Sequence, residues 1–243
     1  MNQNVQQLHE LLKRSSHIVF FGGAGVSTAS NIPDFRSDEG LYSGREQKKY
    51  PYPPETMLSH TFFVRHTEQF FEYYFDKMVY PDAKPNPAHI ALAKLEEMGK
   101  LSAVITQNID GLHQKAGSRE VLELHGSVLR NYCEKCGAFY GLDTILHSTG
   151  VPRCPACGGD IKPDVVLYEE SLDQDVLAKA VHYIRQADLM IIGGTSLVVY
   201  PAAGLVQYFR GRHLVVVNKG QTGSGVGAEL TIDGPIGEIF AQL

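Results

Sequence analysis

Short apolar runs recur along the chain and are separated by longer segments with helical spacing. Residues 18–21 read Ile-Val-Phe-Phe, without alternation, which is typical of a strand buried on both faces of a parallel sheet. Similar runs predict further strands at residues 102–106, 121–124, 188–194, 214–217 and 230–232. Because helical patterns alternate with these strands, the sequence predicts an α/β fold with an open, doubly wound parallel sheet, which is Rossmann-like.

The spacing of apolar residues also predicts the connecting elements. An aromatic-rich helix is expected over residues 61–80, and residues 37–60, rich in Ser, Gly, Lys, Tyr and Pro, are expected to form a mobile loop. Further helices are expected at residues 5–14, 85–98, 173–185 and 201–210.

A glycine-rich turn follows the first strand. Gly22, Gly23 and Gly25 allow a sharp turn and a close approach to a ligand. Ser27 and Thr28 could cap a following helix, whose N-terminus would attract a diphosphate. The pattern departs from the dinucleotide fingerprint because Thr28 stands where the third glycine would be.

Chemically active side chains come directly after the predicted strands. In a doubly wound sheet, ligands bind beyond the carboxyl ends of the strands, so one crevice can collect these residues. An acid, an aromatic ring and an arginine also stand together just past the glycine turn, as Asp34, Phe35 and Arg36. The residues after strands are Gln107, Asn108, Asp110, His125, Thr195, Ser196 and Asn218.

Composition narrows the class of protein. The chain has 243 residues, of which 43% are hydrophobic and 20% charged, as in globular proteins, and its net charge of -5 argues against a general nucleic-acid binder. No apolar run approaches the roughly 20 residues that cross a bilayer, and the N-terminus lacks a signal-peptide core. We therefore expect a cytoplasmic protein with neither a membrane nor a specific nucleic acid as partner.

Four cysteines form two C-x-x-C pairs, Cys133/Cys136 and Cys154/Cys157, with seventeen residues between them. This spacing is typical of a structural four-cysteine zinc site, and iron is the alternative metal. Four thiolates fill the tetrahedral shell of zinc and leave no place for a catalytic water. The cysteines lie in an insertion too small to be held by a hydrophobic core alone.

Taken together, these motifs closely resemble those of the sirtuins, the NAD-dependent protein-lysine deacylases, in their bacterial form with a minimal catalytic core. The matching segments occur in the family's order: residues 23–27 (GAGVS), 32–36 (IPDFR), 106–113 (TQNIDGLH), 125–126 (HG), the cysteine pairs, 194–197 (GTSL) and 217–218 (VN). The resemblance implies a Rossmann-like NAD-binding domain of residues 1–36, 81–129 and 161–243. Residues 37–80 and 130–160 would form a small helical and zinc-binding module.

Two positions depart from the family pattern. Asn31 stands where a glycine is usual, and Tyr168-Glu169-Glu170 replaces the common Phe-Gly-Glu of the substrate-binding strand. The second departure bears on which peptides the chain prefers.

The resemblance also implies a reaction and roles for residues. NAD would be consumed with acetylated-lysine protein substrates, giving nicotinamide, O-acyl-ADP-ribose and free lysine. His125 would be the general base and Asn108 would orient the ribose, with His89 and His113 as rival bases. Asp110 and Ile109 would hold the nicotinamide amide, and Phe35 would cover the reaction centre. The implied NAD contacts are Gly23, Ala24, Gly25, Thr28, Phe35, Arg36, Gln107, Asn108, Ile109, Asp110, His125, Gly194, Thr195, Ser196, Asn218 and Asp233.

Two other functions are compatible with these residues. The same site could transfer ADP-ribose to a protein, although a base at His125 favours deacylation. A nucleotide-binding sensor without turnover is a second alternative, against which Asn108, Asp110 and His125 argue. Sirtuins that prefer succinyl- or malonyl-lysine resemble one another in a Tyr-x-x-Arg pair that binds the acyl carboxylate. The segment around Tyr73 has no such pair, so the resemblance implies acetyl-lysine as the preferred substrate, with Lys77, in a Tyr-x-x-Lys position, as the group that could still reach a carboxylate.

Overall fold

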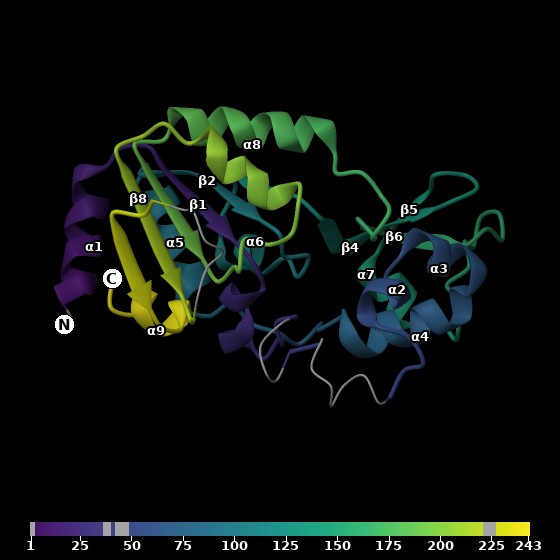
Figure 1. The fold of residues 1–243 in the computed structure, drawn as a ribbon. Coiled ribbons are helices and arrows are strands. Elements are labelled where there is room, and N and C mark those ends of the chain that lie inside the picture. Colours follow the sequence, from purple (N-terminus) through teal and green to yellow (C-terminus); the bar gives the residue numbers. More distant parts are fainter. Residues whose placement is uncertain (1–2, 36–39, 42–48, 221–226) are drawn as a thin grey trace.

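A computed structural model describes residues 3–35, 40–41, 49–220 and 227–243 of the chain (Figure 1). Its larger sheet has six strands in the order β3-β2-β1-β7-β8-β9, and all neighbouring pairs are parallel. This confirms the predicted Rossmann-like sheet. The strands are β1 (Ile18–Gly22), β2 (Leu101–Thr106), β3 (Val121–Glu123), β7 (Leu189–Gly193), β8 (His213–Asn218) and β9 (Leu230–Asp233).

Helices cover both faces of this sheet. The helices α1 (Gln3–Arg14), α5 (Pro87–Glu97) and α9 (Ile236–Phe240) contribute to the core on one face. Helix α8 (Gln174–Gln186) and the 3-10 helix η4 (Ala202–Tyr208) pack on the other (Figure 1). The central strands β1 and β7 are buried along their whole length, which explains why their sequences do not alternate.

Two helices expected near the glycine turn and at residues 201–210 are not α-helices. The chain after β1 forms two 3-10 turns, η1 (Ala24–Val26) and η2 (Thr28–Ser30), and the Ser27 side chain caps neither. The Ser27 hydroxyl bonds to a carboxylate from another strand end instead, and the expected helix N-terminus for a diphosphate is absent from this turn. The segment at residues 201–210 is η4, also a 3-10 helix.

A second, smaller lobe lies beside the large sheet (Figure 1). Its antiparallel sheet has the order β5-β4-β6, and its buried core is rich in aromatic residues such as Phe70, Phe71 and Tyr74. The elements are α2 (Pro54–Met57), α3 (His60–Arg65), α4 (Thr67–Lys77), β4 (Gly126–Cys133), β5 (Phe139–Gly141), α7 (Leu142–Leu146) and β6 (Ile161–Val165). The division of the chain into the two residue sets given above stays a prediction.

The small lobe corrects two expectations. The helix expected over residues 61–80 is broken at His66, whose backbone leaves the helical region with φ -137° and ψ 47°, so that α3 and α4 are separate. The loop expected over residues 37–60 lies partly outside the described residues, and its described part contains α2. Within the described ranges, no helix has the length and apolar character that crossing a membrane requires.

Candidate active site and metal centre

The glycine turn after β1 packs directly on the end of β7. The Gly25 amide donates to the Gly194 carbonyl at 2.8 Å. A Cβ at Gly25 would lie 2.9 Å from Gly194 Cα, and one at Gly194, where φ is +58°, would lie 2.4 Å from the Val26 amide nitrogen. Only glycine therefore allows the turns after β1 and β7 to pack this closely, whether or not a ligand is bound.

Three polar side chains are linked where β1 and β2 end. Ser27 Oγ donates to Asp110 Oδ2 at 2.6 Å, and Asn108 Nδ2 donates to Ser27 Oγ at 3.0 Å. Asp110 Oδ1 accepts from the amide of Leu112, which begins the short helix α6 (Leu112–Ala116), at 2.9 Å. Both oxygens of Asp110 are thus oriented. From the sequence, Ser27 was predicted only as a helix cap. Its place within the glycine motif was the one feature that could have indicated its role in orienting Asp110 and Asn108.

A second link joins the ends of β2 and β7. Gln107 Nε2 donates to Thr195 Oγ1 at 3.1 Å, and the same oxygen accepts from the Leu197 amide at 3.2 Å. The predicted residues Gln107 and Thr195 are therefore brought together, with Ser196 adjoining them. Ala24 and Thr28 lie on the facing 3-10 turns, where Thr28 Oγ1 donates to the Gly25 carbonyl at 3.1 Å.

His125 follows β3, and its ring is positioned by backbone. Its Nδ1 lies 2.9 Å from the Gln107 carbonyl oxygen, which can only accept, so Nδ1 carries the proton and Nε2 keeps a lone pair. Burial lowers the pKa of His125, against an opposing effect of this hydrogen bond. A neutral imidazole with a basic Nε2 is the form that a general base requires. Gly126 beside it has φ +75°, and any Cβ there would collide with the Asp164 carbonyl.

The remaining predicted contacts lie further along the site. Phe35 and Ile109 pack, partly buried, against the aromatic core of the small lobe, and Arg36 lies outside the described residues.

Asn218 and Asp233 are paired at the ends of β8 and β9. Strand β8 is three strands from β2, or about 14 Å along the sheet edge, so this pair cannot contact the same end of a ligand as His125.

Asp233 has a local hydrogen-bond partner. Its Oδ1 accepts from the Gly220 amide at 3.0 Å, while the Asn218 carbonyl accepts from Gly234 at 3.0 Å. One oxygen of Asp233 is therefore used to hold the turn after β8.

The rival histidines are buried in the protein interior. His89 is 0% exposed and His113 1% exposed, and their rings meet edge to face with centroids 4.7 Å apart. Burial lowers the pKa of His89 to about 4 and that of His113 to about 3. His89 Nδ1 also accepts from the Asn86 amide and so completes the capping box of α5. These features indicate a structural role for both.

The four cysteines converge at the end of the small sheet. One sulfur from each lies within 4.8 Å of the others, and the pairs Cys133/Cys157 and Cys136/Cys154 are 3.4 and 3.7 Å apart. Tetrahedral zinc with Zn–S bonds of about 2.3 Å places sulfurs about 3.8 Å apart, so the four cysteines are positioned to bind a zinc ion. The tight turns around them end in Gly137 and Gly158, with φ of +70° and +73°, a backbone conformation that favours glycine.

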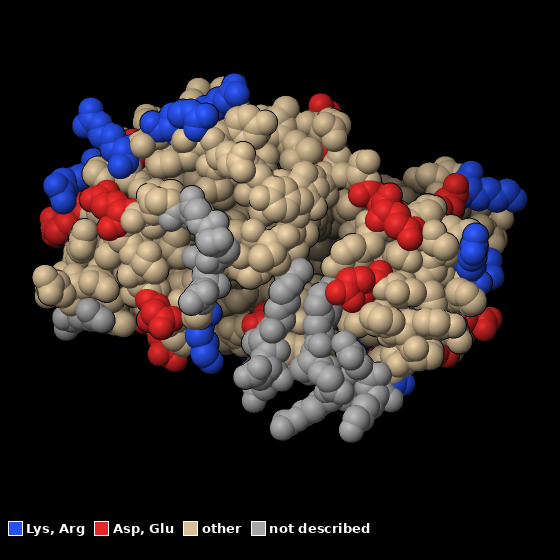
Figure 2. All heavy atoms as spheres, viewed as in Figure 1, with Lys and Arg blue, Asp and Glu red and all other residues tan. Residues whose placement is uncertain are grey.

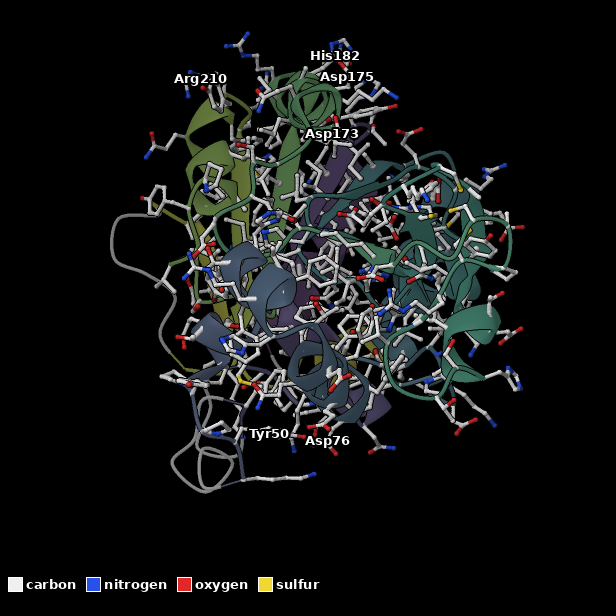
Figure 3. All side chains as sticks on the ribbon, turned by 90° about the vertical axis from the view of Figure 1, so that its right-hand side faces the viewer. Tyr50, Asp76, Asp173, Asp175, His182 and Arg210 are labelled. Carbon is white, nitrogen blue, oxygen red and sulfur yellow. The ribbon has the colours of Figure 1, made fainter. Side chains whose placement is uncertain are left out.

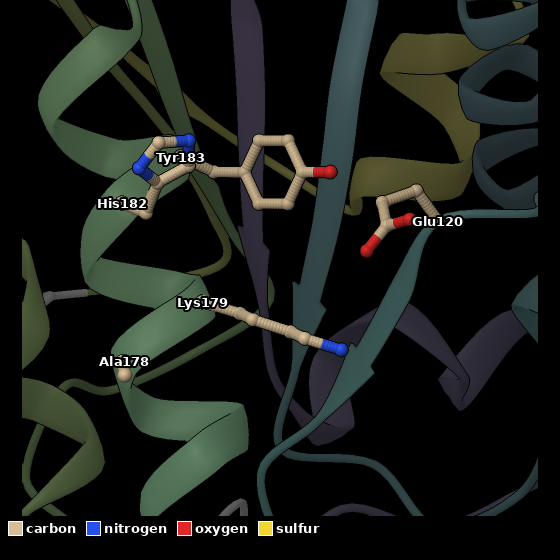
Figure 4. Close-up of a pocket in the computed structure, with 5 residues that line it drawn as sticks. All are labelled: Glu120, Ala178, Lys179, His182 and Tyr183. Carbon is tan, nitrogen blue, oxygen red and sulfur yellow. The ribbon is translucent and has the colours of Figure 1, made fainter.

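A surface hollow of about 440 Å³ lies away from these residues (Figure 4). It is lined by Glu120 and by one side of α8, including Lys179, His182 and Tyr183. Glu120 precedes β3, whereas His125 follows it. The hollow therefore lies at the amino ends of the strands, and the candidate site lies at their carboxyl ends. Figure 3 shows His182 on the outer side of α8, far from Tyr50 and Asp76 at the base of the small lobe.

Comparisons with known proteins give consistent matches. The model of the Sir2 family matches residues 23–201. The NAD-dependent protein deacetylase of Clostridium perfringens is 57% identical over 100% of this chain and 99% of its own length. A Sir2–p53 peptide–NAD+ complex superposes with a TM-score of 0.85 at 41% identity, covering 100% of this chain and 97% of that one. A Sir2 complex with the inhibitor EX-527, 2′-O-acetyl-ADP-ribose and deacetylated p53 peptide gives 0.83 at 39% identity, covering 98% and 96%.

Proposed function

The chain belongs to the Sir2 family and is an NAD-dependent protein-lysine deacetylase, and we propose that His125 is its general base, acting in a site built from the ends of β1, β2 and β7. Acetyl-lysine proteins are its substrates, and nicotinamide, O-acetyl-ADP-ribose and free lysine are its products. The observation that carries the proposed role is the hydrogen bond from His125 Nδ1 to the Gln107 carbonyl, because it directs the basic Nε2 away from the backbone.

NAD supplies an electrophilic ribose carbon when nicotinamide leaves, and the acyl oxygen of the substrate attacks that carbon. His125 Nε2 would then accept the proton of a ribose hydroxyl, whose oxygen attacks the bound acyl carbon. The bond between the acyl carbon and the lysine nitrogen would break as the amine takes up a proton and leaves. Water would then add to the acyl carbon, so that the bond from that carbon to the first ribose oxygen breaks and the acetyl group stays on the attacking ribose oxygen. The carbonyl of Gln107 orients the ring for this step and stabilises the imidazolium that forms, since it bonds to the Nδ1 proton in both charge states.

Asp110 and Asn108 position the reactive end of NAD in this proposal. The Asp110 carboxylate is fixed by Ser27 and by the Leu112 amide, so it can accept the N–H of the nicotinamide amide without reorganising. Asn108, fixed through the same Ser27 hydroxyl, orients the ribose. Ile109 and Phe35 supply apolar surface on the small-lobe side, where Phe35 excludes returning nicotinamide.

The other contacts divide along the sheet edge. The turn with Gly23, Ala24, Gly25 and Thr28 faces the diphosphate together with Gly194, Thr195 and Ser196, and Gln107 holds Thr195 in place. Asn218 and Asp233 stand at the adenosine end. Zinc at the four cysteines is structural, because all four thiolates are used and none of its positions is open. The paired cysteines, none of them in a disulfide, also favour the proposed cytoplasmic location.

One assay tests the activity and its main alternative. We expect nicotinamide release to require an acetylated peptide and to be matched by equal amounts of O-acetyl-ADP-ribose. ADP-ribose found covalently attached to the peptide would instead indicate ADP-ribosyl transfer. NAD binding without nicotinamide release would indicate a sensor.

A further inference from the structure

The segment that leaves β6, residues 166–170, begins beside His125 and runs along the small lobe. The Val166 amide donates to the His125 carbonyl at 3.0 Å, which places the segment next to the proposed base. It then crosses from the small lobe to α8 on the large lobe (Figure 1). There it lies beside the cleft between the two lobes (Figure 2). Tyr168 is 39% exposed there, and Glu169 is exposed as well. The segment therefore combines exposed side chains with a direct backbone contact to the proposed base.

Glu169 has a backbone conformation that disfavours its side chain. Its φ is +76°, in the left-handed region, where a non-glycine residue carries strain. A residue held in such a conformation at a functional site needs surrounding contacts that fix it there. Glycine, which is common at this position of the family pattern, would adopt this φ without strain. The strain at Glu169 therefore has to be offset by contacts of its side chain.

The Glu169 side chain provides such contacts. Its Oε2 accepts from the Thr61 amide in the first turn of α3 at 2.8 Å, and the bonds from Thr61 lower the pKa of Glu169. The backbone of the preceding residue, Tyr168, is paired with the start of α3 and with the residue that ends α2. The Tyr168 amide donates to the Leu58 carbonyl, and the Tyr168 carbonyl accepts from the His60 amide, both at 3.0 Å.

Glu170 reinforces the same connection from the next position. One of its oxygens lies 2.9 Å from His60 Nδ1 on α3. The other accepts from the Leu167 amide at 2.8 Å and from Lys162 Nζ at 3.2 Å. The two carboxylates together tie residues 166–170 to the start of α3 and to β6.

We propose that Glu169 is a positioning residue, whose carboxylate latches residues 166–170 onto α3 and so prepares this segment to receive the acetyl-lysine peptide. The inference rests on the proposed function, since it assigns the segment beside His125 to the peptide. Glycine at this position would adopt φ +76° without strain but would make no bond to α3. The Glu169 carboxylate instead holds the segment in this conformation by a hydrogen bond, before the peptide arrives. Loss of the latch should weaken peptide binding, because the peptide must then order the segment itself.

The experiment compares Glu169→Ala, Glu169→Gly and Glu169→Gln with the wild type on a peptide with uncharged residues around the acetyl-lysine. Peptide KM should rise roughly fivefold in the Ala and Gly variants, the size of effect usual for a lost helix-capping group, and less in Gln, whose amide oxygen still accepts. NAD KM and kcat should change little. Glu68→Gln, an exposed acid on α4 in the same lobe, is the matched control and should leave all three constants unchanged.

The Gly variant separates the latch from simple strain. Glycine suits φ +76°, so Glu169→Gly should unfold at a temperature no lower than Glu169→Ala does, and yet bind peptide as weakly. An unchanged peptide KM in Glu169→Gly would overturn the latch. A KM increase confined to peptides with basic neighbours would also overturn it, because it would show direct charge contact. Wild type that releases no nicotinamide with an acetylated peptide would instead refute the proposed function.

Discussion

Replacing His125 by alanine tests the proposed base directly. The ring is positioned by one hydrogen bond, from Nδ1 to the Gln107 carbonyl. Its Nε2 therefore carries the lone pair that can accept a proton in catalysis. Loss of a general base typically slows a reaction by about 10²- to 10⁴-fold, which is about 2.7 to 5.4 kcal/mol of transition-state stabilisation. The hydrogen bond itself contributes only about 1 kcal/mol to folding, so the variant should remain folded at 25 °C.

The assay measures kcat for deacetylation at saturating NAD and peptide, beside the Kd for NAD by calorimetry. We expect kcat to fall at least 100-fold and the Kd for NAD to change little, because the proposed diphosphate contacts come from the β1 and β7 turns. His182→Ala on the outer side of α8 is the control and should behave as wild type (Figure 3). A His125→Ala enzyme with near-normal kcat would refute the assignment.

The pH profile gives a second check on the same residue. A general base works in its neutral form, so activity is lost as the pH falls through its pKa. Since burial lowers the pKa of His125 below the usual 6.5, the acid limb of the kcat profile should have its midpoint below pH 6.5. A midpoint above pH 7 would contradict the neutral ring inferred from the structure.

Three further predictions concern metal, acid stability and acyl preference. Cys154→Ala should lose its zinc, measured by elemental analysis, and unfold at a lower temperature; an active wild type without zinc or iron would contradict this. Burial lowers the pKa of His89 to about 4 and that of His113 to about 3, so below pH 6.5 the unfolded chain binds more protons. The free energy of unfolding in urea should therefore fall by up to about 2.7 kcal/mol per pH unit between pH 6.5 and 5, and less steeply in His113→Gln. The Asp76 carboxylate, bonded to Tyr50 and Lys77, stands where a carboxylate-binding arginine would be, so kcat/KM should be higher for acetyl- than for succinyl-lysine peptides. The reverse order would refute this.

The large sheet was predictable because its information is local. A strand buried on both faces must be apolar at every position, and residues 18–21 and 189–192 are such runs. The cysteine site was predictable for a similar reason, since two C-x-x-C turns already hold each pair of thiols together. The polar residues after the strands followed from one rule about where parallel strands end.

What the sequence could not give depends on partners distant along the chain. A Ser-Thr pair after a glycine turn predicts a helix cap, but Ser27 bonds to Asp110, 83 residues away, and the helix does not form. The aromatic spacing over residues 61–80 fits one helix as well as two. The break at His66 instead reflects packing of α3 and α4 around the small core. No local pattern contains either contact.

The glycines of the site illustrate why a correct motif can carry an incomplete reason. Read alone, Gly23 and Gly25 indicate a backbone that approaches a ligand. In the structure a Cβ at Gly23 would lie 2.8 Å from Thr195 Cβ, and one at Gly25 would meet the backbone of Gly194. The β1 turn and the β7 turn thus fit together only if both are made of glycine, and this fit places Thr195 beside Gln107. A substitution there would displace the proposed diphosphate contacts before any ligand is bound, so the motif acts first on the shape of the protein and through it on NAD.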